Sequence, residues 1–124
     1  SRGYAPDGGL YVPDSMPAVS LEDLSRWRGL DFAGLAHAVL SLFVGDELEP
    51  SELESLVRSS YAGFTHEQVV PVVRVGGLLV AELFHGPTFC FKDLGQQPLV
   101  RLLAAFAARR GQRRTMLVST TGDT

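Results

Sequence analysis

Residues 82–93 read ELFHGPTFCFKD and combine three structural signals. The stretch opens on the end of an apolar run, passes through Gly86 and Pro87, and closes on Lys92 and Asp93. A Gly-Pro pair favours a turn, and an apolar pattern of helical spacing follows the lysine. We therefore expect a strand, a turn and a helix in succession, with Lys92 at the start of the helix. That order indicates an α/β fold.

Lys92 is the only lysine of the chain, whereas ten residues are arginine. Arginine cannot form a Schiff base with an aldehyde, but lysine can. The positive field at the amino end of a helix and adjacent aromatic side chains both disfavour the protonated amine. Lys92 is thus a candidate nucleophile, and an ordinary exposed surface lysine is the alternative.

The segment after Lys92 has the pattern of one helix. Apolar residues between 99 and 106 recur at helical spacing, and Gly111 supplies a stop signal. Pro98 lies inside this pattern and removes a helical hydrogen bond. We therefore expect the helix to begin after Leu94 or to be kinked.

A second candidate site lies at the end of the chain. Residues 115–119 favour a short buried strand, and a loop rich in threonine and glycine follows it. Hydroxyl groups and backbone amides in such a loop can bind a carboxylate or a phosphate, although a simple turn has the same composition. The loop residues are Thr120, Thr121, Gly122, Asp123 and Thr124.

The segment before residue 82 predicts a β-hairpin. Residues 69–75 are rich in β-branched side chains, Gly76 and Gly77 allow a tight turn, and residues 78–84 form a second apolar run.

Residues 20–64 predict three helices. Ser20 with Asp23, and Ser51 with Glu54, have the spacing of capping boxes. Apolar residues of 32–43 and 53–64 recur at helical spacing, and we expect them in the core. Gly45 marks the end of the first of these two helices. Residues 1–19, with a turn signal at 6–9, predict an ordered arm.

Composition excludes several classes of function. Acidic residues outnumber basic ones by 14 to 11, which argues against nucleic acid as a partner. The sequence has no apolar run of about 20 residues, so we expect no membrane span. We also expect a cytoplasmic protein and no metal site. The single Cys90 rules out an internal disulfide and is expected as a small buried side chain. Because the chain opens on Ser1, removal of a leader segment stays open.

Three motifs resemble the threonine synthase family. They are His85-Gly86-Pro87-Thr88 with Phe91-Lys92-Asp93, then Thr121-Gly122-Asp123-Thr124, and the amino-terminal segment from Gly3 to Pro13. The resemblance implies a pyridoxal 5'-phosphate (PLP) enzyme of fold type II, similar to the tryptophan synthase β chain. Residues 1–68 would form an arm and helical segment, and residues 69–124 the beginning of the PLP-binding α/β domain.

The resemblance also implies a role for individual residues. Lys92 would form the Schiff base with PLP, Phe91 would line the cofactor pocket, and Asp123 would lie near the ring hydroxyl of the cofactor. The loop of Thr120, Thr121, Gly122 and Thr124 would bind the substrate carboxylate. The implied reaction is phosphate loss from O-phosphohomoserine, or a related phosphorylated amino acid, with Lys92 moving protons.

Departures from the family pattern include Cys90, Pro98 and the loop Ser119-Thr120-Thr121, where the family more often has a small residue, Thr and Ser. They place the chain nearer the threonine synthase-like branch, whose reaction can be phosphate elimination alone. The cofactor phosphate loop is expected beyond Thr124, so the chain is interpreted as a truncated, inactive piece. An unpaired sheet edge would favour association, including a homodimer. Alternatives are a dehydratase or cysteine synthase of the same fold, and a non-catalytic interaction module.

Overall fold

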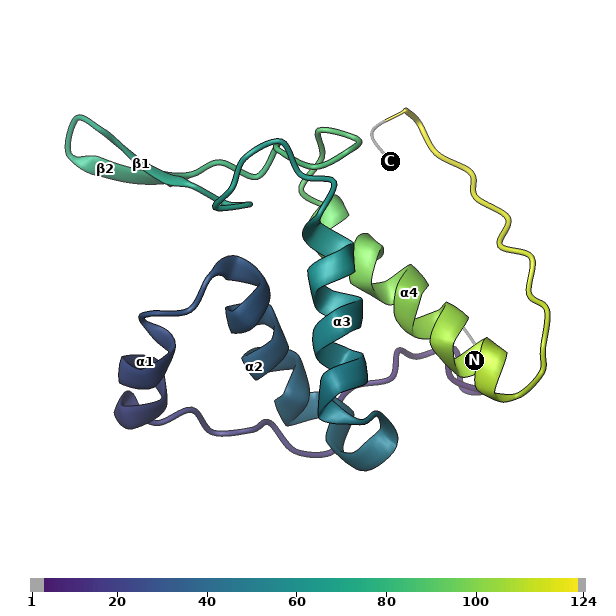
Figure 1. Ribbon diagram of the computed structural model, residues 1–124. Helices are drawn as coiled ribbons and strands as arrows, with labels where there is room; N and C mark the ends of the chain where they lie inside the picture. Colours follow the sequence, from purple (N-terminus) through teal and green to yellow (C-terminus); the bar gives the residue numbers. More distant parts are fainter. Residues whose placement is uncertain (1–3, 123–124) are drawn as a thin grey trace.

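The computed structural model describes residues 4–122, which form helices and one β-hairpin. Figure 1 shows α3 between α2 and α4, while the hairpin projects away from the three helices. This mixture of helices and a small antiparallel sheet agrees with the expected fold class. The elements in chain order are α1 (Leu21–Trp27), α2 (Phe32–Val44), the 3-10 helix η1 (Gly45–Glu47), α3 (Pro50–Tyr61), β1 (Val72–Val75), β2 (Leu78–Ala81) and α4 (Asp93–Arg109).

The start of α1 confirms the first predicted capping box. The Asp23 backbone N–H donates to Ser20 Oγ at 3.1 Å, and the Ser20 backbone N–H donates to Asp23 Oδ2 at 2.9 Å. Hydrogen bonds from the Ser20 hydroxyl and backbone, and then from Arg26, lower the pKa of Asp23 to about 2 from its ordinary 3.8. The local sequence alone is enough to build this helix start.

Replacing Ser20 with alanine is expected to raise the pKa of Asp23 from about 2 toward 3.8, because Ser20 is its main hydrogen-bond donor. A depressed carboxyl pKa stabilises the fold above the unfolded value, and that contribution is lost as pH falls through the folded value. The relevant window is therefore pH 3.8 down to about 2. Titration of the Asp23 carboxyl by NMR, in the native and substituted proteins, measures the shift. An unchanged pKa would contradict this assignment.

The end of α2 agrees with the sequence prediction, whereas the start of α3 does not. Gly45, with a φ of 56°, caps the carboxyl end of α2 as the sequence predicts. The second predicted capping box, Ser51 with Glu54, is wrong. Pro50 occupies the first turn of α3, where its fixed φ and missing N–H cost nothing, so Glu49 becomes the N-cap without a side-chain bond.

The core lies where α2, α3 and α4 meet. Its buried members are Leu48, Leu53, Leu56, Val57, Tyr61 and Val69. Partly buried side chains from α2 and α4 pack against them, including Phe32, Leu40, Leu102 and Phe106. The core thus joins residues on both sides of position 68, and the division of the chain there stays a prediction.

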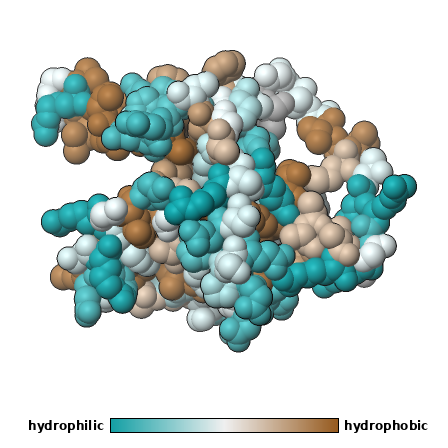
Figure 2. Space-filling model, viewed as in Figure 1, coloured by the Kyte–Doolittle hydropathy of each residue, from teal (hydrophilic) through white to brown (hydrophobic). Residues whose placement is uncertain are grey.

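The hairpin confirms the predicted turn at Gly76 and Gly77, although its strands are shorter than expected. The strands pair antiparallel, with Val75 opposite Leu78 and Val72 opposite Ala81. Val69 has a φ of 59°, which bends the chain and delays the first strand. Large apolar side chains are exposed on both strands, and Figure 2 shows them as apolar surface on the projecting hairpin. They are Val72, Val75, Leu78, Leu79 and Val80.

α4 begins at Asp93 and runs through Pro98. A start after Leu94 is therefore wrong, and the alternative, a kink at Pro98, stays a prediction. Proline has no N–H to donate to the carbonyl oxygen four residues earlier, which here is that of Leu94. The hydroxyl of Tyr61, from α3, donates to this Leu94 oxygen at 3.0 Å. Burial raises the pKa of Tyr61, so the hydroxyl keeps its proton. The neighbouring helix thus supplies the hydrogen bond that the proline removes.

Replacing Tyr61 with phenylalanine is expected to destabilise the fold by about 1 kcal/mol, because the partly buried Leu94 carbonyl loses its hydrogen-bond partner. Chemical denaturation of the complete protein that carries this chain measures the loss. The companion change Pro98→Ala restores the helical N–H and should recover part of it. Equal stability of the native and Tyr61→Phe proteins would show that the hydrogen bond contributes nothing.

The predicted strand at 115–119 is wrong for the described residues. The segment is extended but unpaired, and Leu117 is 98% exposed. A strand needs a hydrogen-bonded neighbour, and the described part of the chain offers none at this position. Figure 1 shows the segment, in yellow, returning alongside α4.

The amino-terminal arm has no helix or strand between residues 4 and 19, yet its predicted turn is present. The Ala5 N–H donates to the Gly9 carbonyl oxygen at 2.9 Å, and Gly8 has a φ of 85°. Across residues 4–122, no helix has both the length and the apolar character that crossing a bilayer requires.

Candidate functional site

Lys92 lies at the start of α4, as the sequence predicts. It is the N-cap residue, with helical backbone angles, and its carbonyl oxygen accepts from the Gln96 N–H at 2.8 Å. Its side chain is half-buried, and Nζ lies 5.8 Å from the centre of the Phe91 ring. A primary amine therefore stands beside an aromatic face at the amino end of a 17-residue helix.

The backbone before Lys92 forms a tight turn. The Phe89 N–H donates to the Gly86 carbonyl oxygen at 3.1 Å, and Phe89 has a φ of 59°. Few residues other than glycine adopt this left-handed conformation without strain, so neighbouring contacts must hold it. Those contacts come from Asp93.

Asp93 ties the turn to the first residue of α4. Its Oδ2 accepts from the Thr88 backbone N–H at 2.8 Å, and its Oδ1 accepts from the Thr88 hydroxyl at 3.0 Å. Its side chain is only 1% exposed. Both carboxylate oxygens are therefore used within the segment that contains Lys92.

Gly86 is required for this packing. A Cβ built on Gly86 would lie 2.6 Å from Asp93 Cβ and 2.7 Å from Asp93 Cγ, closer than side chains approach one another. The turn thus tolerates only a hydrogen at this position.

His85 lies at the entrance to the turn and is bound on both sides. Its Nε2 lies 2.8 Å from Glu82 Oε2, and its carbonyl oxygen accepts from the Thr65 N–H at 2.9 Å. The His66 ring lies 5.0 Å from the His85 ring, centre to centre. No group of three His, Cys, Asp or Glu side chains suited to a metal ion occurs between residues 4 and 122.

The second candidate site is only partly described. The Gly122 N–H donates to Thr120 Oγ1 at 3.2 Å, and Gly122 has a φ of 107°, so a local turn is present at 120–122. Asp123 and Thr124 lie outside the described residues. The segment before this turn runs back along α4 toward the start of that helix (Figure 1).

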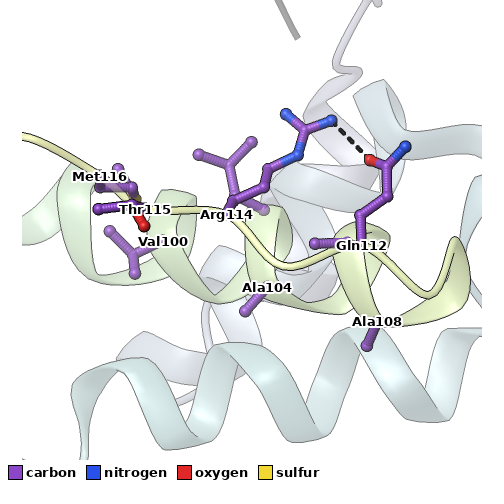
Figure 3. Close-up of a pocket in the computed structure, with 9 residues that line it drawn as sticks. Val100, Ala104, Ala108, Gln112, Arg114, Thr115 and Met116 are labelled. Atoms are coloured by element: carbon purple, nitrogen blue, oxygen red, sulfur yellow. Dashed lines mark hydrogen bonds between the residues drawn. The ribbon is translucent and has the colours of Figure 1, made fainter.

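A cavity of about 550 Å³ lies between α4 and this returning segment. Figure 3 shows Met116 and Thr115 close to Val100, while the Gln112 side chain points toward Arg114. The Arg114 guanidinium donates to Gln112 Oε1 at 3.0 Å. The lining is mostly apolar and does not include Lys92, so this cavity offers no group for chemistry at the lysine.

Comparison with known proteins decides the family. Residues 1–61 match the family model described as the threonine synthase N terminus. The chain belongs to the threonine synthase family. The match covers the amino-terminal motif and the helical segment, which are independent of the lysine motif at residues 85–93.

Relatives in this family extend the similarity over almost the whole chain. The chain is 41% identical over 123 residues to the threonine synthase of Pseudomonas aeruginosa, and 40% identical over 124 residues to human threonine synthase-like 2. Each alignment covers 98% of this chain and 26% of the relative, so the chain spans about a quarter of their length. Because the two identities are so close, the placement nearer the threonine synthase-like branch stays a prediction.

A solved threonine synthase confirms the fold. The chain superposes on the PLP-bound threonine synthase from Brucella melitensis with a TM-score of 0.86 and 41% sequence identity. The superposition covers 90% of this chain and 24% of that protein. The helices and hairpin described above are therefore part of the threonine synthase fold.

Two contacts of this site are not visible in the sequence patterns. The spacing of Thr88 and Asp93 is not that of a helix or a strand, so periodicity does not pair them. Tyr61 and Leu94 are 33 residues apart and belong to different helices. One local clue to the first contact is present in the sequence. The turn signal at Gly86 is followed by a hydroxyl at Thr88 and a carboxylate at Asp93, but the sequence prediction did not pair them.

Proposed function

We propose that the complete protein carrying this chain is a PLP-dependent phospholyase of the threonine synthase type. Its substrate would be O-phosphohomoserine or a related phosphorylated amino acid. The observation that carries the proposal is the position of Lys92, the only lysine of the chain, half-buried at the start of α4 behind a rigid turn. Family membership supports the same conclusion.

The residues around Lys92 fit the proposed cofactor. Lys92 would hold the cofactor through its primary amine, which is the side-chain group able to react with an aldehyde. The Phe91 ring, which lies beside the amine, offers an apolar wall for a planar pyridine ring. PLP, when bound, supplies an electron sink for carbanion chemistry.

We further propose a separate role for each candidate site residue of this chain. The amine of Lys92 would accept and donate protons at the substrate carbons. Thr120, Thr121, Gly122 and Thr124 would bind the substrate carboxylate through hydroxyl and backbone N–H groups. Asp123 would lie near the ring hydroxyl of the cofactor. The turn at 120–122, with its left-handed Gly122, supports an anion-binding loop at this position.

The overall reaction balances as O-phosphohomoserine plus water giving threonine plus inorganic phosphate. The phosphate leaves from the γ-carbon, and water adds at the β-carbon. Elimination without addition of water at the β-carbon would release phosphate without threonine. The two outcomes are therefore separated by their products.

Incubation of the complete, PLP-loaded protein with O-phosphohomoserine tests the proposal. Phosphate release is measured by a colorimetric assay, and threonine by amino-acid analysis. O-phosphoserine, which is one carbon shorter, is the matched substrate control. Phosphate release that depends on PLP supports the phospholyase, and accompanying threonine identifies the replacement reaction. A folded, PLP-loaded protein that releases no phosphate from any phosphorylated amino acid would favour the non-catalytic interaction module instead.

A further inference from the structure

Asp93 is the only buried charged residue between positions 4 and 122. None of the ion pairs formed within this range includes it. Removing a carboxylate from water without a cationic partner costs several kcal/mol unless hydrogen bonds and local dipoles replace the water. The burial of this group next to Lys92 therefore needs a physical reason.

Two features compensate for the burial of the Asp93 carboxylate. Two hydrogen bonds come from Thr88, through its backbone N–H and its hydroxyl. Asp93 is also the first residue of α4, where the field of the helix favours a negative charge. The two hydrogen bonds hold residue 88 against the start of the helix, and Lys92 lies inside the loop that they close.

The backbone of Lys92 is consequently held on both sides. On the carboxyl side, its carbonyl oxygen accepts from Gln96 in the first helical turn. On the amino side, the Asp93 N–H donates to the Cys90 carbonyl oxygen at 3.0 Å, and the carboxylate holds Thr88. Neither the backbone of residues 88–93 nor the origin of the lysine side chain can move without breaking these bonds.

We propose that Asp93 is a positioning residue, which fixes the 88–93 turn so that the Lys92 amine is presented in one orientation to the cofactor aldehyde. This inference rests on the proposed function of Lys92. Asp93 acts through the turn and touches neither substrate nor cofactor in this mechanism. A misplacement of about 1 Å at a reacting atom can reduce the rate about a hundredfold, so loss of the fixed position of the Lys92 amine should be measurable.

The test compares two cofactor forms in the complete protein. PLP can bond to Lys92, whereas pyridoxamine phosphate has no aldehyde and cannot. The preference for PLP over pyridoxamine phosphate, from dissociation constants, therefore reports the covalent link separately from the integrity of the pocket. Asp93→Asn retains the size of the side chain but replaces one acceptor with a donor that faces Thr88.

Asp93→Asn is expected to reduce the preference for PLP at least about tenfold, while binding of pyridoxamine phosphate is unchanged. Thr88→Val, which loses only the hydroxyl, should give a smaller reduction, and Thr88→Ser should retain the native preference. If Asp93→Asn fails to fold, the pair at position 88 decides the question. Equal weakening of both cofactor forms, or an unchanged preference, would overturn the proposal. A native protein that forms no covalent link would instead refute the proposed function itself.

Discussion

Replacement of Lys92 by alanine is expected to abolish the covalent attachment of PLP to this chain. No other lysine of residues 1–124 can substitute, because none exists. The native protein should absorb at ~400 nm with PLP, as expected of a protonated Schiff base, and borohydride should fix the cofactor to Lys92. The variant should lack both signals. Its turnover should fall by about 10²–10⁴-fold or more, since loss of a positioned proton-transfer group alone costs this much.

Lys92→Arg provides the matched control for charge. The guanidinium keeps a positive charge at the start of α4 but cannot attack an aldehyde. Both variants should therefore lose the covalent link, while the arginine protein retains the electrostatics of the site. Peptide mapping after reduction identifies the attachment point. Cofactor fixed at another position in the native protein would remove Lys92 from the mechanism.

Gly86→Ala is expected to produce the second largest effect. The new Cβ would overlap the Asp93 side chain, with 2.6 Å to its Cβ and 2.7 Å to its Cγ. Since Asp93 is buried in the first turn of α4, either the helix start or the 86–90 turn must shift. Overpacking of this kind costs about 1–3 kcal/mol of stability. Displacement of the adjacent Lys92 should also reduce turnover by about a hundredfold.

Gly29→Ala is the control for that substitution. Gly29 lies between α1 and α2, and a Cβ there meets no atom within 4 Å. Its thermal midpoint and turnover should stay native, whereas those of Gly86→Ala should both fall. Native turnover in Gly86→Ala would show that the turn can adjust without moving the lysine.

The features that the sequence predicts correctly depend on neighbouring residues. Ser20 and Asp23 are three positions apart and form their capping box within one helical turn. Gly45 ends α2, and Gly76 forms the hairpin turn with a φ of 59°. Lys92 lies at the start of α4 because the Gly-Pro turn and the helical pattern meet there.

The wrong predictions each involve a competing local effect or a distant partner. Pro50 takes the first position of α3 and excludes the capping box of Ser51 and Glu54. Residues 115–119 have strand composition, but pairing depends on a neighbour that no pattern within the segment reveals. Pro98 stays inside α4 because Tyr61, from another helix, binds the Leu94 carbonyl. Such rescue is a tertiary effect and cannot be predicted from spacing along one helix.

Some residues of the candidate site can likewise be predicted from the sequence, and others cannot. The resemblance carried by residues 85–93 picks out Lys92 and Phe91, and the structure places the amine beside the ring. The supporting contact of Thr88 with Asp93 depends on the path of an irregular turn, which no periodicity describes. Sequence reasoning therefore finds the reacting group more readily than the groups that hold it.

The exposed hairpin has a consequence for biosynthesis. Its apolar residues on both strands lack a covering layer within the described residues, and an isolated two-stranded hairpin is barely stable in water. In a protein as long as the relatives, about three quarters of the chain would still be untranslated when this hairpin leaves the ribosome. At roughly 5–20 residues per second, translation of that remainder takes on the order of tens of seconds. During this interval the apolar side chains of the hairpin have no partner from the remainder of the chain, so we expect the nascent hairpin to need protection from aggregation until that remainder is made.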